Sequence, residues 1–140
     1  MFITRASRHD KADLAEFLGA HGNTDSDVSE GLSYVARDGG IVGCVRLVEV
    51  APETVVVDDV LVAERRRGEG IGRRVIQAAM NAKGGTLYLC CHDDKIAFYS
   101  HFGFSEVDFD SMPDEVRAYF ERVGDHPTDP GHTHHFLKAR

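Results

Sequence analysis

The sequence predicts a single domain of the α/β (α+β) class, built on a mixed, mostly antiparallel sheet of six to seven strands that is flanked by helices. Residues 32–62 contain three apolar, branched stretches separated by turn residues, which is typical of an antiparallel meander. Residues 54–91 then show strand, helix and strand, and such a unit connects parallel strands through a right-handed crossover. The 140 residues suffice for one core, so we expect one domain over residues 1–140.

The N-terminal half contains a short strand, a helix and the meander. Leu14, Phe17 and Leu18 recur at helical spacing. Turn residues at 38–40 and 51–53 separate the strands of the meander, and the polar residues 21–29 are expected to form a loop or a short helix. These features place a strand, a helix and three further strands at residues 2–5, 11–18, 32–37, 41–50 and 54–62.

The C-terminal half alternates between helices and strands. An apolar stripe predicts a helix that begins at Ile71 and ends at the glycines 84–85. Residues 111–114 resemble a capped helix start with an early proline, and the helix that follows has an apolar face of Val116, Tyr119, Phe120 and Val123. We expect the other elements as strands at 86–91, 104–109 and 132–138 and a helix at 93–100.

Composition and charge exclude several classes of protein. The net charge of −7 provides no general basic surface for nucleic acid, and no stretch approaches the roughly 18 consecutive apolar residues of a membrane helix. The first residues lack the pattern of a signal peptide. Three cysteines, of which Cys90 and Cys91 are adjacent, are no disulfide framework. We therefore expect a cytoplasmic protein with reduced thiols and without a nucleic-acid or membrane partner; whether it forms a homodimer is left open.

A basic, glycine-rich segment follows the last strand of the meander. From Val62 the chain passes through the arginines 65–67 to Gly68, Gly70 and Gly72. Glycines let backbone N–H groups approach a ligand, and the first turn of the next helix adds unpaired donors, so the segment is suited to a pyrophosphate. The spacing matches neither a P-loop nor a Rossmann fingerprint. Taken alone, the segment equally fits a glycine-rich connection with solvated arginines.

Two motifs in this region resemble the GNAT superfamily of N-acetyltransferases. Residues 65–70 and 67–72 both match its signature Q/R-x-x-G-x-G/A, and residues 98–104 match its downstream motif F-Y-x-x-x-G-F at the expected distance. The resemblance implies the GNAT fold, with a sheet splayed between the fourth and fifth strands. It also implies acetyl-CoA as the co-substrate, bound in the splay, and no metal.

The resemblance assigns roles to individual residues. Tyr99 matches the general acid, or the hydrogen-bond donor to the CoA sulfur, and by itself it equally fits a tyrosine packed on a helix. His92 stands where the family often has an asparagine. The resemblance assigns acetyl-CoA binding to Leu61, Val62, Arg67, Gly68, Glu69, Gly70, Ile71, Gly72 and Arg73.

A general base for the amine is expected among three residues. Asp58 and Asp59 end a run of valines, and a period of two places Asp58 on the same strand face as Val60 and Val62. A carboxylate between valines fits a base that acts through water, and it fits equally well an exposed or ion-paired strand residue. His92 is the rival, because its imidazole titrates in a suitable range.

Three histidines near the C-terminus suggest a metal, but the pattern is weak. His132 and His134 share a strand face and His135 is adjacent, yet no acid or cysteine accompanies them at a diagnostic spacing. Histidines on the surface of a terminal strand are the simpler interpretation, so we expect no metal site.

The function implied is transfer of the acetyl group of acetyl-CoA to a primary amine of a small molecule, directly within a ternary complex. Residues 103–116 resemble the N-acetylglutamate-synthase-like branch, which favours an amino-acid-like acceptor, and Arg46 would then hold its carboxylate or serve as a paired structural arginine. Two alternatives stay open. One is a protein lysine or N-terminal acetyltransferase of the same fold, and the other is a non-catalytic CoA-binding regulatory module.

Overall fold

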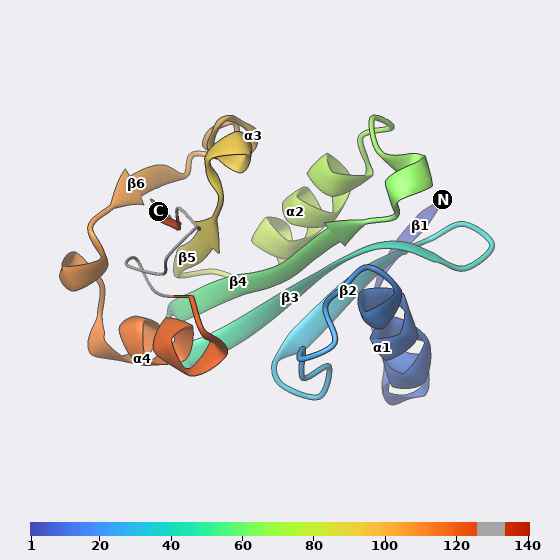
Figure 1. Cartoon of the computed structure of the whole chain (residues 1–140), viewed down its shortest axis with the longest axis horizontal. Helices are drawn as coiled ribbons and strands as arrows, with labels where there is room; N and C mark the ends of the chain where they lie inside the picture. Colours follow the sequence, from blue (N-terminus) through green and yellow to red (C-terminus); the bar gives the residue numbers. More distant parts are fainter. Residues whose placement is uncertain (126–133) are drawn as a thin grey trace. The chain divides into compact units, whose positions relative to one another are not determined.

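The computed structural model describes residues 1–125 and 134–140, and it contains the predicted order of strands and helices (Figure 1). The strands are β1 (Phe2–Arg5), β2 (Leu32–Arg37), β3 (Ile41–Ala51), β4 (Thr54–Val62), β5 (Thr86–Cys91), β6 (Ser105–Val107) and β7 (His135–Ala139). The α-helices are α1 (Lys11–Ala20), α2 (Ile71–Ala82), α3 (Ile96–Ser100) and α4 (Asp114–Val123). Over the described residues, no helix combines the length and the apolar character needed to cross a bilayer.

The strands form one seven-stranded mixed sheet in the order β1-β2-β3-β4-β5-β7-β6. β1 and β2, β2 and β3, β5 and β7, and β6 and β7 pair antiparallel, whereas β4 and β5 are parallel and α2 connects them. The parallel register runs from Thr54 opposite Thr86 to Val56 opposite Tyr88. The predicted fold class, a mixed and mostly antiparallel sheet flanked by helices, is therefore confirmed.

Two compact units divide the chain. Unit 1 comprises residues 1–48 and 57–84, and unit 2 comprises residues 49–56 and 85–140. The predicted divergence of β4 from β5 beyond their register depends on how the units are placed, so it stays a prediction.

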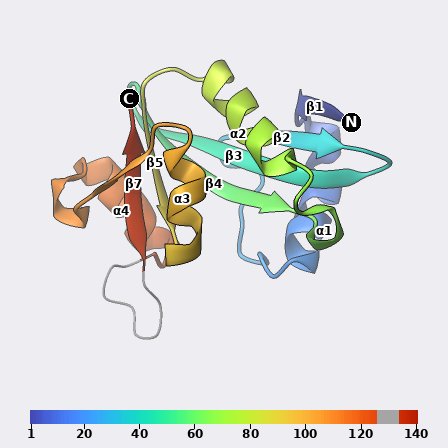
Figure 2. The ribbon, with the colours of Figure 1, turned by 90° about the horizontal axis from the view of Figure 1, so that it is seen from above.

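In unit 1, α1 and α2 lie on opposite faces of the strands (Figure 2). The amphipathic pattern of each helix explains this, since each buries one apolar stripe against the sheet and leaves its polar side exposed. The buried stripes are Leu14, Phe17 and Leu18 on α1 and Ile71, Val75, Ile76 and Ala79 on α2.

In unit 2, α3 and α4 lie on opposite sides of β5 and β7 (Figure 2). An aromatic cluster joins α4 to β7, because the ring of Phe136 lies 5.2 Å from that of Phe120 and 5.1 Å from that of Phe109, both edge to face. Of the four apolar residues predicted on one face of α4, Val116, Tyr119 and Phe120 are buried and Val123 at the helix end is exposed.

Several predicted boundaries are wrong, each for a local reason. The strand predicted at 104–109 shortens to β6, because Phe109 enters a 3-10 turn (Phe109–Ser111) and packs on Phe136 instead. Ser111 does not cap α4, since its hydroxyl donates to the Asp108 carbonyl and Pro113 precedes the helix. The helix predicted at 93–100 begins as a 3-10 turn. For residues 21–29, expected as a loop or a short helix, the structure has turns, which agrees with the loop. β7 begins at His135, while His132 lies outside the described residues.

We expect Gly31→Ala to destabilise the fold more than Gly39→Ala. Both glycines have positive φ, 76° and 72°, so each alanine carries a similar backbone strain of about 1 kcal/mol. A Cβ at Gly31 would also overlap the Leu47 carbonyl, whereas a Cβ at Gly39 meets no atom within 4 Å. The overlap should add about 1–3 kcal/mol to the loss in unfolding free energy, measured by urea denaturation. Equal losses for the two variants would contradict this packing.

Candidate active site

The glycine-rich segment connects β4 to α2 through a short 3-10 turn (Glu64–Arg66). Gly68 and Gly70 adopt positive φ values of 85° and 82°, which turn the chain into the helix. The first hydrogen bond of α2 runs from the Arg74 N–H to the Gly70 carbonyl, at 3.2 Å. The amides of residues 71–73 therefore precede the helical ladder and, together with the helix dipole, form a cradle for an anion.

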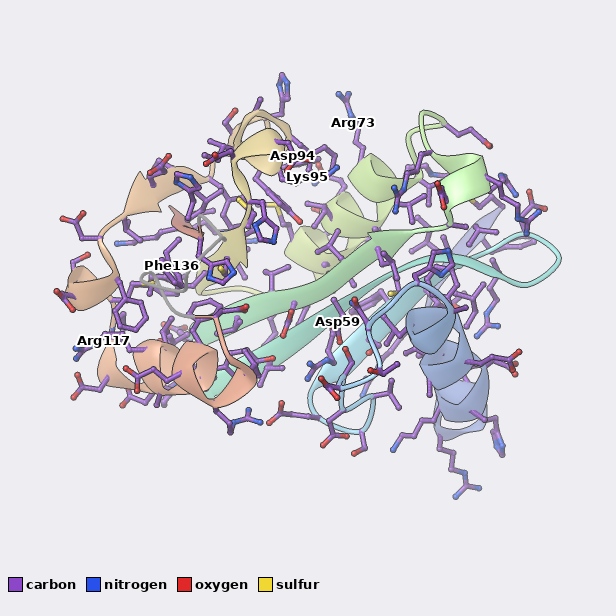
Figure 3. All side chains as sticks on the ribbon, in the orientation of Figure 1. Asp59, Arg73, Asp94, Lys95, Arg117 and Phe136 are labelled. Atoms are coloured by element: carbon purple, nitrogen blue, oxygen red, sulfur yellow. The ribbon has the colours of Figure 1, made fainter. Side chains whose placement is uncertain are left out.

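The arginines of this segment have different roles. Arg66 stabilises the loop, since its guanidinium donates to the Glu69 carboxylate at 2.9 Å and to the Asp38 carboxylate in the β2–β3 turn at 3.0 Å. Hydrogen bonds to these two carboxylates raise the pKa of Arg66. The Glu69 side chain is thus occupied, and Glu69 can offer a ligand only its backbone. Arg67 donates to the Val62 carbonyl at 3.4 Å, and Arg73 is exposed and points away from α2 (Figure 3).

Gly43 positions the start of α2, a role that the sequence analysis missed. A Cβ at Gly43 would lie 2.7 Å from Cγ2 of Ile71 and 3.4 Å from the Leu61 carbonyl oxygen. The absent side chain lets the first residue of α2 rest on β3 and fixes the cradle above the sheet. A glycine inside a run of branched strand residues is a known signal of such close approach, so the sequence did contain it.

A buried arginine on β3 gathers three carboxylates. Arg46 is 3% exposed, and its Nε lies 2.8 Å from Asp59 Oδ2. Its terminal nitrogens lie 3.1 Å from Glu30 Oε1 and 3.5 Å from Asp58 Oδ2. A buried guanidinium must be paired, so Arg46 is held by the protein's own acids. This arrangement matches the structural alternative that the sequence left open for Arg46.

The two aspartates of β4 do not follow the alternation predicted for them. Asp59 has a φ of 52°, which breaks the regular alternation of side chains within β4, and its N–H donates to Asp58 Oδ1 at 2.8 Å. Both carboxylates consequently face the same guanidinium, which strict alternation would not allow. Asp59 is 7% exposed and Asp58 is 29% exposed at the side chain. Asp58 is therefore the more accessible acid.

The turns between α1 and β2 cover this cluster. Ser26 donates to Asp59 Oδ1 at 2.7 Å, and both the carboxylate and the carbonyl of Glu30 accept from Arg46. Figure 3 shows Asp59 beside this segment. Gly31 follows Glu30 directly and packs on β3 through its bare backbone. Sequence reasoning missed Ser26 and Glu30, because nothing in a polar loop indicates which strand it contacts.

Two of the three cysteines are poor nucleophiles. Burial, with the Asp59 carboxylate as the next cause, raises the pKa of Cys44 to about 12. Its Sγ donates to the Asp59 carbonyl at 3.2 Å. Burial also raises the pKa of Cys91 to about 11, with help from Glu106. Since the thiolate is the reactive form, neither thiol suits an acyl-enzyme intermediate at neutral pH.

The remaining predicted residues belong to unit 2. Tyr99 lies on α3 and is buried, with its ring 5.0 Å from Phe98 and 5.9 Å from Phe104, both edge to face. His92 follows β5, is exposed, and lies 5.3 Å from the ring of His134. Unit 1 brings Asp58 and Asp59 together and carries the glycine loop, whereas Tyr99 and His92 are each placed within unit 2.

Residues 29–106 of this chain match the Acetyltransferase (GNAT) domain. The chain belongs to the GNAT acetyltransferase family. The glycine loop, β4 and Tyr99 all fall inside the matched residues, and as a GNAT member the chain is an acyltransferase. No curated protein matches it in sequence.

Solved structures share the GNAT fold of this chain. ElaA from Escherichia coli is similar with a TM-score of 0.72 at 16% identity, over 99% of each chain. Rv2747 from Mycobacterium tuberculosis, solved in complex with CoA, has a TM-score of 0.71 at 18% identity, over 99% of this chain and 98% of its own. N-acetylglutamate synthase from Neisseria gonorrhoeae, complexed with CoA and N-acetyl-glutamate, has a TM-score of 0.72 at 18% identity, over 100% of this chain and 35% of the synthase. At these identities the similarity concerns the fold alone.

We expect iodoacetamide at pH 8 to leave Cys44 and Cys91 of the folded protein unmodified. Both thiols stay protonated well above this pH, since their pKa values are about 12 and about 11. Peptide mass spectrometry after brief labelling measures the modified fraction, and labelling in urea, where all three cysteines should react, is the control. Rapid modification of Cys44 in the folded protein would contradict its burial.

Proposed function

We propose that the 140-residue chain is one GNAT domain that transfers the acetyl group of acetyl-CoA to a primary amine of a small molecule, by direct attack in a ternary complex. The observation that carries the proposal is the loop at the end of β4, where the amides of residues 71–73 lie ahead of the first helical hydrogen bond in a family whose relatives are solved with CoA. These amides, with those of Gly68 and Gly70, would hold the pyrophosphate.

The chemistry uses backbone and side-chain groups of this chain. Backbone groups of Leu61 and Val62 would pair with the extended pantetheine arm, as a strand edge pairs with a peptide. The neutral amine attacks the thioester carbon, a C–N bond forms, and the C–S bond breaks with its electron pair on sulfur. Tyr99 would donate a proton to the departing thiolate, because a phenol with a pKa near 10 is protonated at neutral pH.

Asp58 is the better candidate for the base. Asp59 is nearly buried and is held by both Arg46 and Ser26, so its carboxylate has little freedom to act. The side chain of Asp58 is more exposed, at 29% against 7% for Asp59, and its Oδ2 lies 3.5 Å from Arg46. In the proposal Asp58 attracts the ammonium group of the acceptor and accepts its proton through a water molecule.

The acid cluster also bears on which amine is bound. Arg46 is occupied by Glu30, Asp58 and Asp59, so it does not support the amino-acid-like acceptor whose carboxylate it would hold. Three carboxylates around one guanidinium leave an excess of negative charge. This excess favours a cationic amine without a carboxylate beside the reacting nitrogen.

Thiol release from acetyl-CoA across matched amines tests this function. Each set comprises an amino acid, its amide and the corresponding decarboxylated amine, so that only the carboxylate changes. We expect release with the decarboxylated amine and the amide, and at least about tenfold slower release with the amino acid, from the charge of the cluster. A preference for the amino acid would overturn the proposed acceptor class.

Calorimetry with CoA, read together with thiol release, distinguishes the proposed acetyltransferase from a CoA-binding regulatory module and from a protein acetyltransferase. Gly70→Val should abolish binding, because in the proposal the pyrophosphate approaches the backbone of this loop and a branched side chain at Gly70 would obstruct it. Gly39→Val, which also has a positive φ and open space, is the matched control and should bind normally. CoA binding without thiol release from any amine would indicate a regulatory module, and release only with peptides would indicate a protein acetyltransferase.

We expect Asp58→Asn to lower kcat/KM for the amine by about 100-fold at neutral pH, within the usual range for a general base. Asparagine keeps the shape and the oxygen that accepts from the Asp59 N–H, so the backbone conformation at Asp59 should persist. Because a free amine accumulates as pH approaches 10, the deficit should shrink with rising pH. A His92→Gln variant serves as comparison. Loss of activity there, with Asp58→Asn fully active, would move the base to His92.

A further inference from the structure

Unit 2 contains a cluster of three different metal-ligating side chains. The Sγ of Cys90, a carboxylate oxygen of Asp125 and a ring nitrogen of His134 all lie within 4.8 Å of one another, and all three residues are half-buried. They come from β5, from the chain just after α4 and from the residue before β7. We propose that this cluster binds a divalent transition-metal ion, with Zn²⁺ as the best fit, independently of acetyl transfer.

The geometry is close to that of a zinc site. With Zn–S near 2.3 Å and Zn–N near 2.0 Å in a tetrahedron, sulfur and nitrogen lie about 3.5 Å apart. Ligand atoms within 4.8 Å of one another need to approach by little more than about 1 Å, which side-chain rotation can supply. The three ligands belong to separate segments, so the ion would join β5, the end of α4 and the start of β7.

His92 lies outside the group of ligand atoms within 4.8 Å, and in the proposal it approaches the ion as a fourth ligand. Its ring centroid lies 5.3 Å from that of His134, and it stands two residues after Cys90. Three protein ligands with one further histidine complete a tetrahedral Cys-His-His-Asp set. As a ligand, His92 would carry no free lone pair for the amine, so the metal site gives this exposed histidine a role other than that of the base.

The donor set selects the kind of metal. A thiolate with imidazole suits Zn²⁺ and its neighbour Co²⁺, whereas Mg²⁺ and Ca²⁺ require oxygen donors. The neighbouring residues are engaged elsewhere: His135 binds Asp93 and Glu106, and the buried Cys91 follows Cys90 on a strand, where successive side chains point to opposite faces.

Binding would stabilise unit 2 by mass action, because the ligands converge only in the folded chain. The sequence did not predict the site, since its ligands lie at positions 90, 92, 125 and 134 and show no compact spacing. Cys90 and His92 form a Cys-x-His pair, which was the available signal.

Cobalt titration of the full-length protein, with any purification tag removed, tests the site. We expect a thiolate-to-cobalt charge-transfer band in the near ultraviolet, which reports a cysteine ligand, and displacement of cobalt by Zn²⁺. Cys90→Ser should abolish the band, and His134→Gln should weaken affinity at least about tenfold. Cys91→Ser and His101→Gln, the adjacent thiol and an exposed histidine outside the cluster, should leave the band unchanged. No band in the wild type, or an equal band in Cys90→Ser, would overturn the proposal.

Protection of the wild-type thiol gives a measurement that does not depend on the variants folding. Zn²⁺ should slow alkylation of Cys90 by iodoacetamide at least about tenfold, since a metal-bound thiolate is a weaker nucleophile, and EDTA should restore the rate. Unchanged labelling of Cys90 at saturating Zn²⁺ would overturn the site.

Discussion

Arg46 is buried on β3, and a buried guanidinium is stable only when carboxylates or carbonyls surround it. This requirement organises unit 1. Asp59 reaches Arg46 because its positive φ breaks the alternation of side chains within β4, and Glu30 reaches it because the turns between α1 and β2 fold across the sheet. One ion cluster thereby joins two strands and a loop. Removing the arginine would leave three acids without their shared cation, so the positions of Asp59 and of the loop depend on it.

The positive φ of Asp59 also bears on the proposed chemistry. Regular alternation would place Asp58 and Asp59 on opposite faces of β4, whereas this φ turns both toward Arg46 and leaves Asp58 partly exposed. A few residues further on, the strand ends at Val62 and the chain enters the glycine loop. Gly43 on β3 holds the start of α2 close to the sheet. The placement of the proposed base and of the proposed pyrophosphate-binding amides thus depends on two departures from regular strand structure.

Unit 2 is organised by aromatic packing, whereas unit 1 is organised by ion pairing. Aromatic packing of Phe109, Phe120 and Phe136 joins α4 to β7 and takes Phe109 out of the strand predicted for it. The proposed metal ligands Cys90, Asp125 and His134 lie on β5, just after α4 and just before β7, and β5 leads through His92 to α3 and Tyr99. An ion at Cys90 and His134 would therefore stabilise the segment that precedes the proposed acid catalyst.

The sequence by itself determined the order of the strands and helices, the mixed sheet, the family and the glycine loop, because periodicity and glycine spacing are local properties of the chain. Tertiary structure alone decided which residues meet. Arg46 could be assigned to a substrate or to the fold only when Glu30 and the two aspartates of β4 were placed around it. Cys90 and His134 likewise become neighbours only when β5 pairs with β7. Burial and long-range pairing depend on contacts between segments that are far apart in the chain. The sequence alone does not specify which of these segments come into contact.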